Sequence, residues 1–589
     1  MSNILHLYGA GSNLTAVTGD AGLLCEFAPD SPWIRRTESL YGPDEMLGSA
    51  DSALMVAHSL VRKLLHAASA IDELPTLTIY EEPLLEQLSY IVQTFQLDRW
   101  IGSKGFSECR FESYSPWLDR LRQVRALTDS KYALIAGLPL AQGNWVYRSL
   151  GKLWKSPGRP SELFRRVAPL WSRYWSAARI RKVASTVPQG GIWCYSTAYN
   201  VTKIGLEYEP YFPEKMNFLV EDPATGGKRL GELGRDFHVL YAWSRASDVP
   251  SISEVRALGD RLTAAVLSVP LTGEENALSR VLLNSDWWHL FVKRWLGFVL
   301  FHGRAVQRWC QAVAPEILVV GNAGWERALL QCKEAEGIPS VMLQHGVMHW
   351  VYTVADQPVA KFLLRGKFFQ RLINEKLRRK TLVCNYPQAH RTTAEWRANP
   401  RDDILFITAP YDVPELFHRG DLRDIVRSLL RASYSCRRRL VIRVHPLERL
   451  SLYQRLVSEI EKELELRTDV VYSQGPGVEE VLARSCVAVL YFSTMFLDCL
   501  RHGIPIVSFA WHWFPYKRQF EAAGIFNFAA DLRDLEQLVR NGVEGRLPSR
   551  GAGLEDFLEP SRPEEISMLL RELWESRPAN RAASIIPRS

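Results

Sequence analysis

Residues 478–507 read VEEVLARSCVAVLYFSTMFLDCLRHGIPIV, and the order of apolar and polar residues in them indicates the fold class. The apolar run over 487–491 is short and is followed by Phe-Ser-Thr, which is typical of a buried strand. A helix is predicted over 495–501, because Gly503 follows it and a Pro stands two residues further on. The apolar residues 506–509 predict the next strand. A strand, a helix and a strand in succession indicate a parallel sheet joined by crossover helices.

The same alternation extends in both directions from this stretch. Nearer the middle of the chain, strands are predicted over 403–408, 439–444 and 469–472, and helices over 422–432, 453–464 and 477–483. In the N-terminal half, short apolar runs predict strands over 4–8, 77–80, 192–196, 317–320 and 340–343. The sequence therefore predicts an α/β protein with Rossmann-like, doubly wound parallel sheets.

The chain length requires more than one domain. With 589 residues it exceeds what a single hydrophobic core supports. The apolar pattern breaks near 380–402, so we expect an N-terminal domain over 1–385 and a C-terminal domain over 386–589. Within the first domain, basic and aromatic helical insertions are expected at about 140–310.

The composition is that of an ordinary globular protein, with 47% hydrophobic and 23% charged residues. The nine Cys residues form no CxxC pair and show no metal-ligand spacing, so we interpret them as buried thiols in a reducing compartment. The N-terminus lacks a basic segment followed by a long apolar core, and no window has the length of a membrane-spanning helix. We expect a cytoplasmic protein, or one attached to the inner membrane from the cytoplasmic side.

Positive charge is concentrated in one segment. Residues 148–182 hold ten Lys or Arg and one acid, Glu162, which leaves about −2 for the rest of a chain whose net charge is +7. One patch on a near-neutral protein does not favour a nucleic-acid partner. Interleaved Trp and Tyr suggest contact with an anionic membrane surface. A second aromatic stretch, 286–309, is either of the same kind or a core helix, and we favour the core helix.

Polar residues follow several of the predicted strands. These are Gln344-His345-Gly346 after 340–343, Arg443 to Pro446 at the end of 439–444, and Ser493-Thr494 after 487–491. In an open parallel sheet, ligands bind outside the carboxyl ends of the strands. Because polar residues follow strands in both halves of the chain, the sequence predicts a two-domain enzyme that binds an anionic ligand between the halves.

Two of these clusters have a clear physical rationale. Pro446 prevents a regular strand from continuing, so His445 is held at the strand end, where an imidazole can donate a hydrogen bond to phosphate. Ser493 and Thr494 open a helix, whose hydroxyls and unpaired N–H groups can bind an anion. The alternatives are a His that caps a strand end without a ligand, and ordinary N-capping.

The segments GIPSVMLQHG, AKFLLRGKFF, DDILFITAP, RVHP and 478–507 together resemble bacterial surface-polysaccharide glycosyltransferases of the GT-B fold. Capsule-type Kdo transferases and bacterial sialyl- or polysialyltransferases, which use CMP-activated sugars, are the most similar. The resemblance covers about 310–510 and implies two sheet domains facing a cleft. It implies that His445 contacts the nucleotide phosphate and that His345 faces the cleft from the opposite wall. The implied donor-binding set is Gln344, Gly346, Arg443, His445, Pro446, Ser493 and Thr494.

An inverting transfer also needs a base that removes the proton of the acceptor hydroxyl. The sialyltransferase pattern has an acidic pair followed by Gly, and Glu81-Glu82 match the pair while Pro83 stands in place of the Gly. The candidate catalytic residues are therefore Glu81, Glu82 and His345. The alternative is a solvated acidic pair, with Glu207 and Glu209 as reserve candidates for the base.

We expect a glycosyltransferase without a metal or other cofactor, because no DxD motif stands at a strand end. The expected partners are a nucleotide sugar, a glycan or glycolipid acceptor and the inner-leaflet surface. Three alternatives remain open: a UDP- or GDP-hexose transferase on the same fold, a CDP-polyol phosphotransferase, and a non-catalytic scaffold.

The basic segment generates a test of membrane attachment. Replacing Arg165, Arg166, Arg173 and Arg179 by Glu should release the protein from anionic liposomes, because each cation near such a surface contributes about 1 kcal/mol. Attachment of the unmodified chain should weaken with salt, since the attraction is screened over about 8 Å at physiological ionic strength. Sedimentation with liposomes measures both effects. Failure of the unmodified chain to sediment at low salt would contradict membrane attachment.

Overall fold

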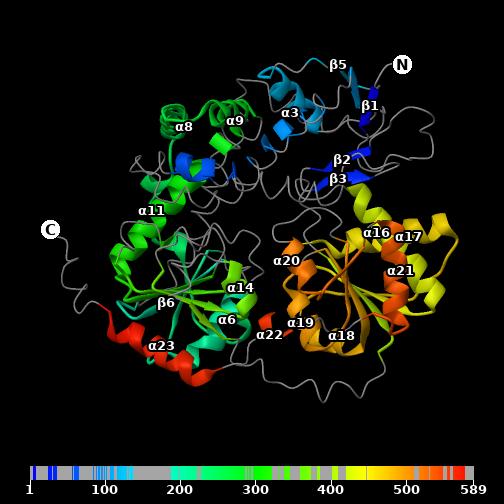
Figure 1. Ribbon diagram of the computed structural model, residues 1–589. Coiled ribbons are helices and arrows are strands. Elements are labelled where there is room, and N and C mark those ends of the chain that lie inside the picture. Colours follow the sequence, from blue (N-terminus) through cyan, green and yellow to red (C-terminus); the bar gives the residue numbers. More distant parts are fainter. Residues whose placement is uncertain are drawn as a thin grey trace. The chain divides into compact units, whose positions relative to one another are not determined.

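A computed structural model provides the architecture (Figure 1). It describes residues 4–7, 24–28, 31–35, 107–111, 116–128, 133–136, 188–197, 199–221, 227–285, 296–321, 337–344, 359–372, 381–384, 401–408, 419–445, 448–475, 477–491, 493–509, 517–529, 531–547, 554–557 and 562–577, with short pieces between 56 and 101, at 131, between 288 and 292, and at 329–330. The chain forms two compact units. Unit 1 comprises Met1–Ala53, Val92–Gly143 and Arg391–Phe557, and unit 2 comprises Leu54–Ile91, Asn144–His390 and Leu558–Ser589.

The main sheet of unit 1 has six parallel strands in the order β15-β14-β13-β16-β17-β18. The strands are β13 (Asp403–Ile407), β14 (Arg439–Arg443), β15 (Val470–Ser473), β16 (Ser485–Leu490), β17 (Ile506–Ser508) and β18 (Asn527–Phe528). In chain order this is 3-2-1-4-5-6, the doubly wound arrangement of dinucleotide-binding folds. The order reverses between β13 and β16.

Helices cover both faces of this sheet (Figure 1). They are α16 (Arg419–Cys436), α17 (Leu450–Leu464), α18 (Val478–Arg484), α19 (Met495–Arg501), α20 (Lys517–Ala522), α21 (Leu532–Val543) and α22 (Leu554–Phe557). Alternate residues of the strands, such as Ile404 and Phe406, pack with α16, α17 and α21 in one continuous hydrophobic core. Burial on both faces explains why these strands are almost wholly apolar.

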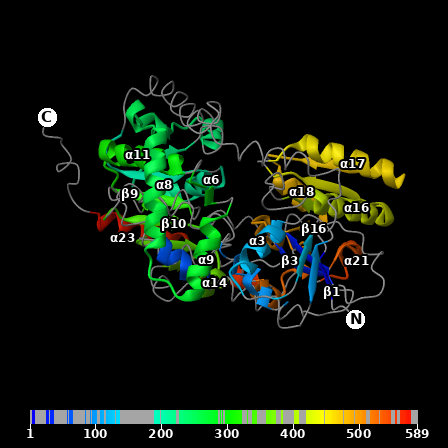
Figure 2. The same cartoon turned by 90° about the horizontal axis from the view of Figure 1, so that it is seen from above.

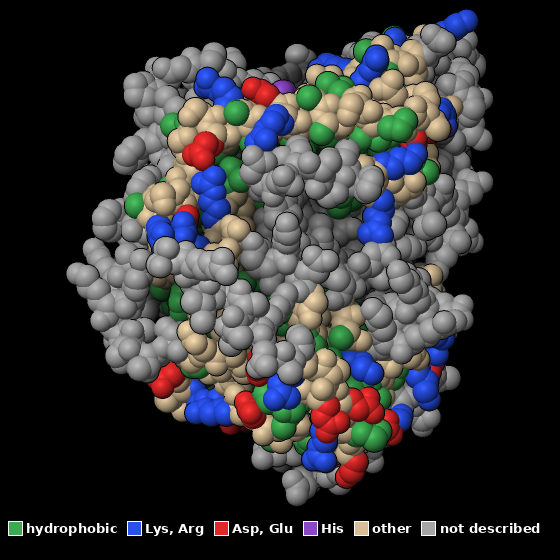
Figure 3. Space-filling model, turned by 90° about the vertical axis from the view of Figure 1, so that its left-hand side faces the viewer, with side chains coloured by type: hydrophobic (Ala, Val, Ile, Leu, Met, Phe, Trp, Pro, Cys, Tyr) green, Lys and Arg blue, Asp and Glu red, His purple; other side chains and the backbone are tan. Residues whose placement is uncertain are grey.

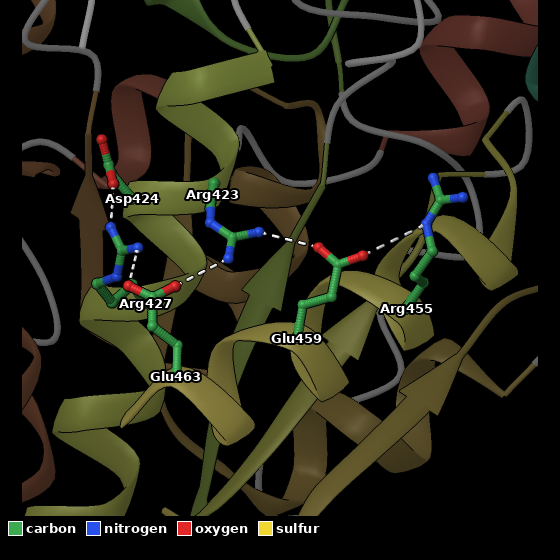
Figure 4. Close-up of polar contacts among 6 residues, drawn as sticks. All are labelled: Arg423, Asp424, Arg427, Arg455, Glu459 and Glu463. Carbon is green, nitrogen blue, oxygen red and sulfur yellow. Dashed lines mark hydrogen bonds and ion pairs between the residues drawn. The ribbon is translucent and has the colours of Figure 1, made fainter. Parts of the chain in front are cut away.

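An ion-pair network joins α16 to α17, which lie side by side (Figures 2 and 4). Its members are Arg423, Asp424, Arg427, Arg455, Glu459 and Glu463. Arg423 bridges Glu459 at 3.0 Å and Glu463 at 2.8 Å, and these hydrogen bonds raise the pKa of its guanidinium. Because the side chains are partly exposed, solvent screening leaves each pair only a small net contribution to stability. The main effect of the network is to link α16 to α17 at defined positions along the two helices.

Unit 1 also contains a separate N-terminal part. Its strands β1 (Ile4–Leu7), β4 (Glu108–Phe111) and β5 (Ala133–Ala136) form a parallel sheet in the order β1-β4-β5, and α3 (Pro116–Arg125) lies between the last two in sequence. The strands β2 (Leu24–Ala28) and β3 (Ser31–Arg35) pair in antiparallel fashion.

The sheet of unit 2 has seven parallel strands in the order β12-β11-β10-β9-β6-β7-β8. They are β6 (Ile192–Ser196), β7 (Asn217–Val220), β8 (His238–Val239), β9 (Ile317–Gly321), β10 (Ser340–Leu343), β11 (Lys361–Leu364) and β12 (Thr381–Val383). The order again runs 3-2-1-4-5-6, with one more strand at the far edge. Here it reverses between β6 and β9.

The helices of unit 2 are α6 (Tyr199–Tyr208), α7 (Lys228–Glu232), α8 (Ile252–Leu267), α9 (Gly273–Leu283), α11 (Leu296–Val313), α14 (Lys367–Leu372) and α23 (Pro563–Glu575), with 3-10 turns η3 (Glu209–Tyr211), η4 (Leu240–Trp243) and η5 (Ala246–Asp248). The aromatic stretch 286–309 supplies α11, in which Phe301 and Trp309 are fully buried. This confirms the core-helix interpretation.

The last helix belongs to the same unit as the seven-stranded sheet. The backbone N–H of Arg562, just before α23, donates to Sγ of Cys384 at 3.0 Å. Lys361 of β11 lies 3.9 Å from Glu572, and Arg577 lies 3.5 Å from Glu316. The chain therefore returns to unit 2 after completing the main sheet of unit 1.

The predicted fold class is confirmed: two parallel-sheet α/β units, each with a doubly wound strand order. Residues 192–239 contribute three strands to the sheet of unit 2, although they fall inside the insertion expected at about 140–310. The predicted first strand, β1, pairs with β4 rather than with this sheet. The predicted strand 77–80 lies outside the described residues, and the domain limits 1–385 and 386–589 stay a prediction.

Two predictions about the surface concern the basic segment 148–182 and the lack of a membrane-spanning helix. The basic segment 148–182 lies outside the described residues. On the face shown in Figure 3, the described Lys and Arg side chains are interspersed with Asp and Glu. Among the described helices, none is both long enough and apolar enough to cross a membrane.

One close contact beneath α21 provides a test of the packing in unit 1. A Cβ added at Gly542 would lie 2.6 Å from Cγ2 and 2.8 Å from Cβ of Val487 in β16. Overpacking of this kind costs about 1–3 kcal/mol, which should exceed the gain of about 1 kcal/mol from replacing Gly by Ala in a helix. Gly542→Ala should therefore lower the midpoint of thermal unfolding, measured by calorimetry.

The matched control is Gly231→Ala in α7, where no atom lies within 4 Å of the added Cβ. This variant should unfold at the same temperature as the unmodified chain or slightly above it. Equal midpoints for the two variants would show that the approach of α21 to β16 does not require glycine.

Candidate functional site

The carboxyl ends of the unit 1 strands bring together most of the described polar residues predicted for the site. Of these, His445 follows β14 and Ser493 follows β16. Thr408, which was not predicted, follows β13. Arg443 is the last residue of β14. Because β13 and β16 flank the reversal of strand order, their ends border the crevice in which open α/β sheets bind ligands.

A buried hydrogen-bond network holds the turn after β14. The hydroxyl of Thr408 accepts from the backbone N–H of His445 at 2.8 Å and donates to the carboxylate of Glu448. The phenol of Tyr453, on α17, donates to the other oxygen of Glu448 at 2.7 Å. Glu448 and Tyr453 are 5% and 0% exposed, so the two bonds to the Glu448 carboxylate are made away from water. The turn that carries His445 is thereby tied to β13 and to α17.

Gln474, just after β15, fastens the same turn from the other side. Its amide nitrogen donates to the carbonyl of His445 at 3.0 Å and to the carbonyl of Glu448 at 2.9 Å. The backbone of His445 therefore has partners at both its N–H and its carbonyl. Burial lowers the pKa of the His445 imidazole below its ordinary value, so the ring is neutral at pH 7. A neutral ring can donate one hydrogen bond to a ligand.

Arg443 carries a buried positive charge at this edge of the sheet. Its side chain is 7% exposed and donates to Oγ of Ser473 at 2.7 Å and to the carbonyl of Gly475. Both acceptors are neutral, and among the described residues no carboxylate forms an ion pair with Arg443. Burial lowers the pKa of the guanidinium, but an arginine stays protonated in proteins. The site therefore contains a cation that would be stabilised by an anionic ligand.

Ser493 and Thr494 precede α19 as predicted, but they do not cap it in the usual way. Thr494, the N-cap residue, has helical backbone angles and makes no side-chain capping bond. The hydroxyl of Ser493 accepts weakly from the backbone N–H of Met495 at 3.4 Å. The alternative of ordinary N-capping is thus not supported for Thr494, and the ligand-binding roles of both residues stay predictions.

In unit 2, Gln344 is buried at the end of β10. Its amide oxygen accepts from the backbone N–H of Arg365 at 3.0 Å, and its own N–H donates to the carbonyl of Leu363 at 3.1 Å. These bonds join the ends of β10 and β11, which is a structural role. Whether Gln344 also contacts a donor stays a prediction. His345, Gly346, Pro446, Glu81 and Glu82 lie outside the described residues.

The reserve candidates for the base have different surroundings. Glu209 forms a two-pronged ion pair with Arg235, at 2.8 and 2.7 Å, and accepts from the backbone N–H of Met216 at 3.1 Å. These contacts hold the carboxylate of Glu209 in a structural ion pair at the start of η3. Glu207 is half-buried on α6.

Four residues that hold the His445 turn were not predicted from the sequence: Thr408, Glu448, Tyr453 and Gln474. Thr408 ends an apolar run, so its position was a usable signal. Glu448 and Tyr453 have no such signal, because they meet Thr408 only in the folded chain. Among the described residues, no group of three or more His, Cys, Asp or Glu could hold a metal ion.

Comparison with known proteins finds no matching family model and no matching curated protein. Several solved structures are similar. The UDP-GlcNAc 2-epimerase of Methanocaldococcus jannaschii, in complex with UDP-GlcNAc and UDP, is 10% identical, with 66% of this chain and 99% of that chain covered and a TM-score of 0.40. The Neisseria meningitidis UDP-GlcNAc 2-epimerase is also 10% identical, with 66% of this chain and 99% of that chain covered and a TM-score of 0.39. A glycosyltransferase from Rickettsia africae is 10% identical, with 68% of this chain and 100% of that chain covered and a TM-score of 0.34. These likenesses say nothing about substrate.

The Thr408 network generates a stability test. Thr408→Val removes the hydroxyl and leaves the N–H of His445 and the carboxylate of Glu448 without that partner, at about 1–3 kcal/mol for each buried group. Thr408→Ser keeps the hydroxyl and removes one methyl group, which costs about 1 kcal/mol. Chemical unfolding should therefore rank the valine variant well below the serine variant. Similar losses in the two variants would show that the hydroxyl is unimportant.

Proposed function

We propose that this chain is a glycosyltransferase of the GT-B type that moves a sugar from a CMP-activated donor onto a bacterial surface polysaccharide or glycolipid. The favoured sugar is Kdo or a sialic-type sugar, in keeping with the resemblance of the C-terminal motifs. The observation that carries the proposal is the buried guanidinium of Arg443 at the carboxyl end of β14, whose acceptors among the described residues, Ser473 and Gly475, are neutral.

The charge of Arg443 supports an anionic ligand on energetic grounds. Burying a cation is costly unless an opposite charge or strong hydrogen bonds compensate it. Ser473 and Gly475 supply hydrogen bonds but no charge. Phosphate supplies both, and the planar fork of arginine matches its oxygens. A nucleotide phosphate bound at the carboxyl end of β14 would therefore compensate the buried positive charge of Arg443.

His445 and Arg443 together would assist departure of the nucleotide. When the bond between the sugar and the phosphate breaks, the nucleoside monophosphate keeps the electron pair and gains negative charge. Fixed donors and a cation that face this charge lower the barrier without a metal ion. The network of Thr408, Glu448 and Tyr453 keeps the backbone of His445 in place, so little reorganisation is needed during the reaction.

The proposal includes a location. We propose that the protein acts at the inner leaflet, where the segment 148–182 would contact anionic lipid and a glycolipid acceptor would be presented. The local charge and the interleaved aromatic residues of that segment support this part.

A nucleotide screen tests the donor class. CMP should raise the thermal unfolding temperature of the protein more than UDP, GDP or CDP-glycerol. A larger shift with UDP or GDP would favour a hexose transferase on the same fold, and one with CDP-glycerol would favour a polyol phosphotransferase. The absence of any shift would favour a non-catalytic scaffold.

Substitution of Arg443 locates the phosphate. Arg443→Gln should weaken CMP binding by about 10- to 150-fold, as expected from about 1.5–3 kcal/mol for a hydrogen bond to a charged group. The exposed Arg467 provides the control, because Arg467→Gln should leave the dissociation constant unchanged. Calorimetric titration measures both constants. Equal CMP affinity in the two variants would remove Arg443 from the site.

The lowered pKa of His445 adds a dependence on pH. A bound phosphate should raise this pKa, so CMP affinity should increase as the pH falls from 7 through the region below 6.5. The phosphate itself gains a proton near pH 6, so His445→Ala is the required comparison. In His445→Ala, the part of the rise in CMP affinity at low pH that comes from protonation of the imidazole should be absent.

A further inference from the structure

Three consecutive residues at the end of β15 contact both parts of the candidate phosphate site. Ser473 and Gly475 accept hydrogen bonds from the guanidinium of Arg443. Gln474, which stands between them, donates to the turn that carries His445. Because β15 pairs with β14 in parallel, with Ser473 opposite Arg443, the segment 473–475 lies beside the end of β14. One short segment is thus bonded to Arg443 and to the His445 turn.

The amide of Gln474 connects the first and last residues of this turn. Its nitrogen donates to the carbonyl of His445 at 3.0 Å and to the carbonyl of Glu448 at 2.9 Å. A primary amide has two N–H donors, so both bonds are made at once. The backbone N–H of Glu448 also donates to the carbonyl of His445, at 2.9 Å. The carbonyl of His445 therefore has two donors, one of which comes from outside the turn.

The backbone of the segment permits both sets of contacts. Gly475 has a φ of 82°, in the left-handed region that glycine adopts at no steric cost. A Cβ added to it would meet no atom within 4 Å, so the backbone conformation, and not close packing, favours glycine here. The chain turns directly after Gln474. The carbonyl of Gly475 can therefore meet Arg443 while the side chain of Gln474 meets the His445 turn.

These contacts of Gln474 add little to the stability of the fold. Gln474 is exposed, so water competes for its hydrogen bonds, and holding a glutamine side chain in one conformation costs entropy. Their consequence is geometric. The N–H of His445 is bonded to Thr408 of the neighbouring strand end, and its carbonyl is bonded to Gln474. The backbone of His445 is thus fixed from two sides, and one of these sides is the segment that also contacts Arg443.

We propose that Gln474 is a positioning residue, which fixes His445 relative to Arg443 so that both act on the same phosphate. This inference rests on the proposed function. Two groups that bind one phosphate do so best when their separation is set before the ligand arrives, because the cost of ordering them is then not incurred on binding. Gln474 acts through His445 and does not itself contact the phosphate.

The first experiment compares Gln474→Met with Gln454→Met. Methionine has nearly the length of glutamine but has no N–H to donate. The dissociation constant of CMP should rise by about 3- to 10-fold in Gln474→Met, the range that corresponds to one neutral hydrogen bond. Gln454 is an exposed residue of α17, and its variant should bind CMP like the unmodified protein. Calorimetric titration measures the constants, and the unfolding temperature of both variants should stay close to that of the unmodified protein.

The second experiment tests whether Gln474 acts through His445. Gln474→Met is combined with His445→Ala, and the CMP affinity of the double variant is compared with that of His445→Ala. If the only role of Gln474 is to position His445, the double variant should bind CMP no more weakly than His445→Ala. A general defect of the site would lower the affinity by the same factor whether or not His445 is present, and that result would overturn the proposal.

The pH dependence of binding gives a readout that a purely structural role would not change. The part of the rise in CMP affinity below pH 7 that requires the imidazole of His445 should be smaller in Gln474→Met. Glu448 and Tyr453, the ionisable side chains of the described network around the turn, are present in both proteins, as is Arg443. A loss of affinity by the same factor at every pH would contradict the role of Gln474.

The outcomes distinguish this inference from the function on which it rests. Equal CMP affinity in Gln474→Met and Gln454→Met, with weaker binding in Arg443→Gln, would overturn the role of Gln474 and leave the proposed function standing. Failure of the unmodified protein to bind CMP would overturn the proposed function, and the inference with it.

Discussion

The pairing of the two central strands is the constraint on which each unit depends. In unit 1 β13 pairs with β16, and in unit 2 β6 pairs with β9, in parallel, and every residue of these four strands except the half-buried Cys486 is buried. The chain builds outward from one strand of the pair and then returns to build outward from the other. The connections on the two sides therefore diverge, and a crevice opens at the carboxyl ends. The positions of Thr408 and Ser493 follow directly from this pairing.

Buried charges at the two ends of the unit 1 strands have different partners. At the amino edge, Asp403 is paired with Arg439 at 2.8–3.0 Å and lies 3.4 Å from Arg484, so its charge is compensated within the protein. At the carboxyl edge, Arg443 has neutral acceptors. Compensated charge serves the fold, whereas a buried cation without a charged partner among the described residues is better explained by a ligand. For this reason we place the candidate ligand site at the carboxyl ends of the strands rather than at their amino ends.

Much of the fold could be predicted because its central strands contain apolar runs with polar residues at their ends. The limits predicted for β13, β14 and β16 agree with the structure to within two residues. The strands β8 and β18 were missed because they have two residues each, too few to show a pattern. The candidate site was predictable where a polar residue ends an apolar run, as with Arg443 and His445. Glu448 and Tyr453 were not, because an acid in a turn and a tyrosine on a helix face are common in any sequence.

The α/β class, the parallel pairing and the strand ends at which polar residues stand can be inferred from the amino-acid sequence, because they follow from local apolar runs and from the residues that end them. Which strands are neighbours is known only from the folded chain, in which β1 pairs with β4 and the last helix belongs to unit 2. Folding alone brings Glu448 to Thr408 and Arg235 to Glu209. Those contacts join residues far apart in the chain, and their energy comes from burial and hydrogen bonding, which no local pattern of residues encodes.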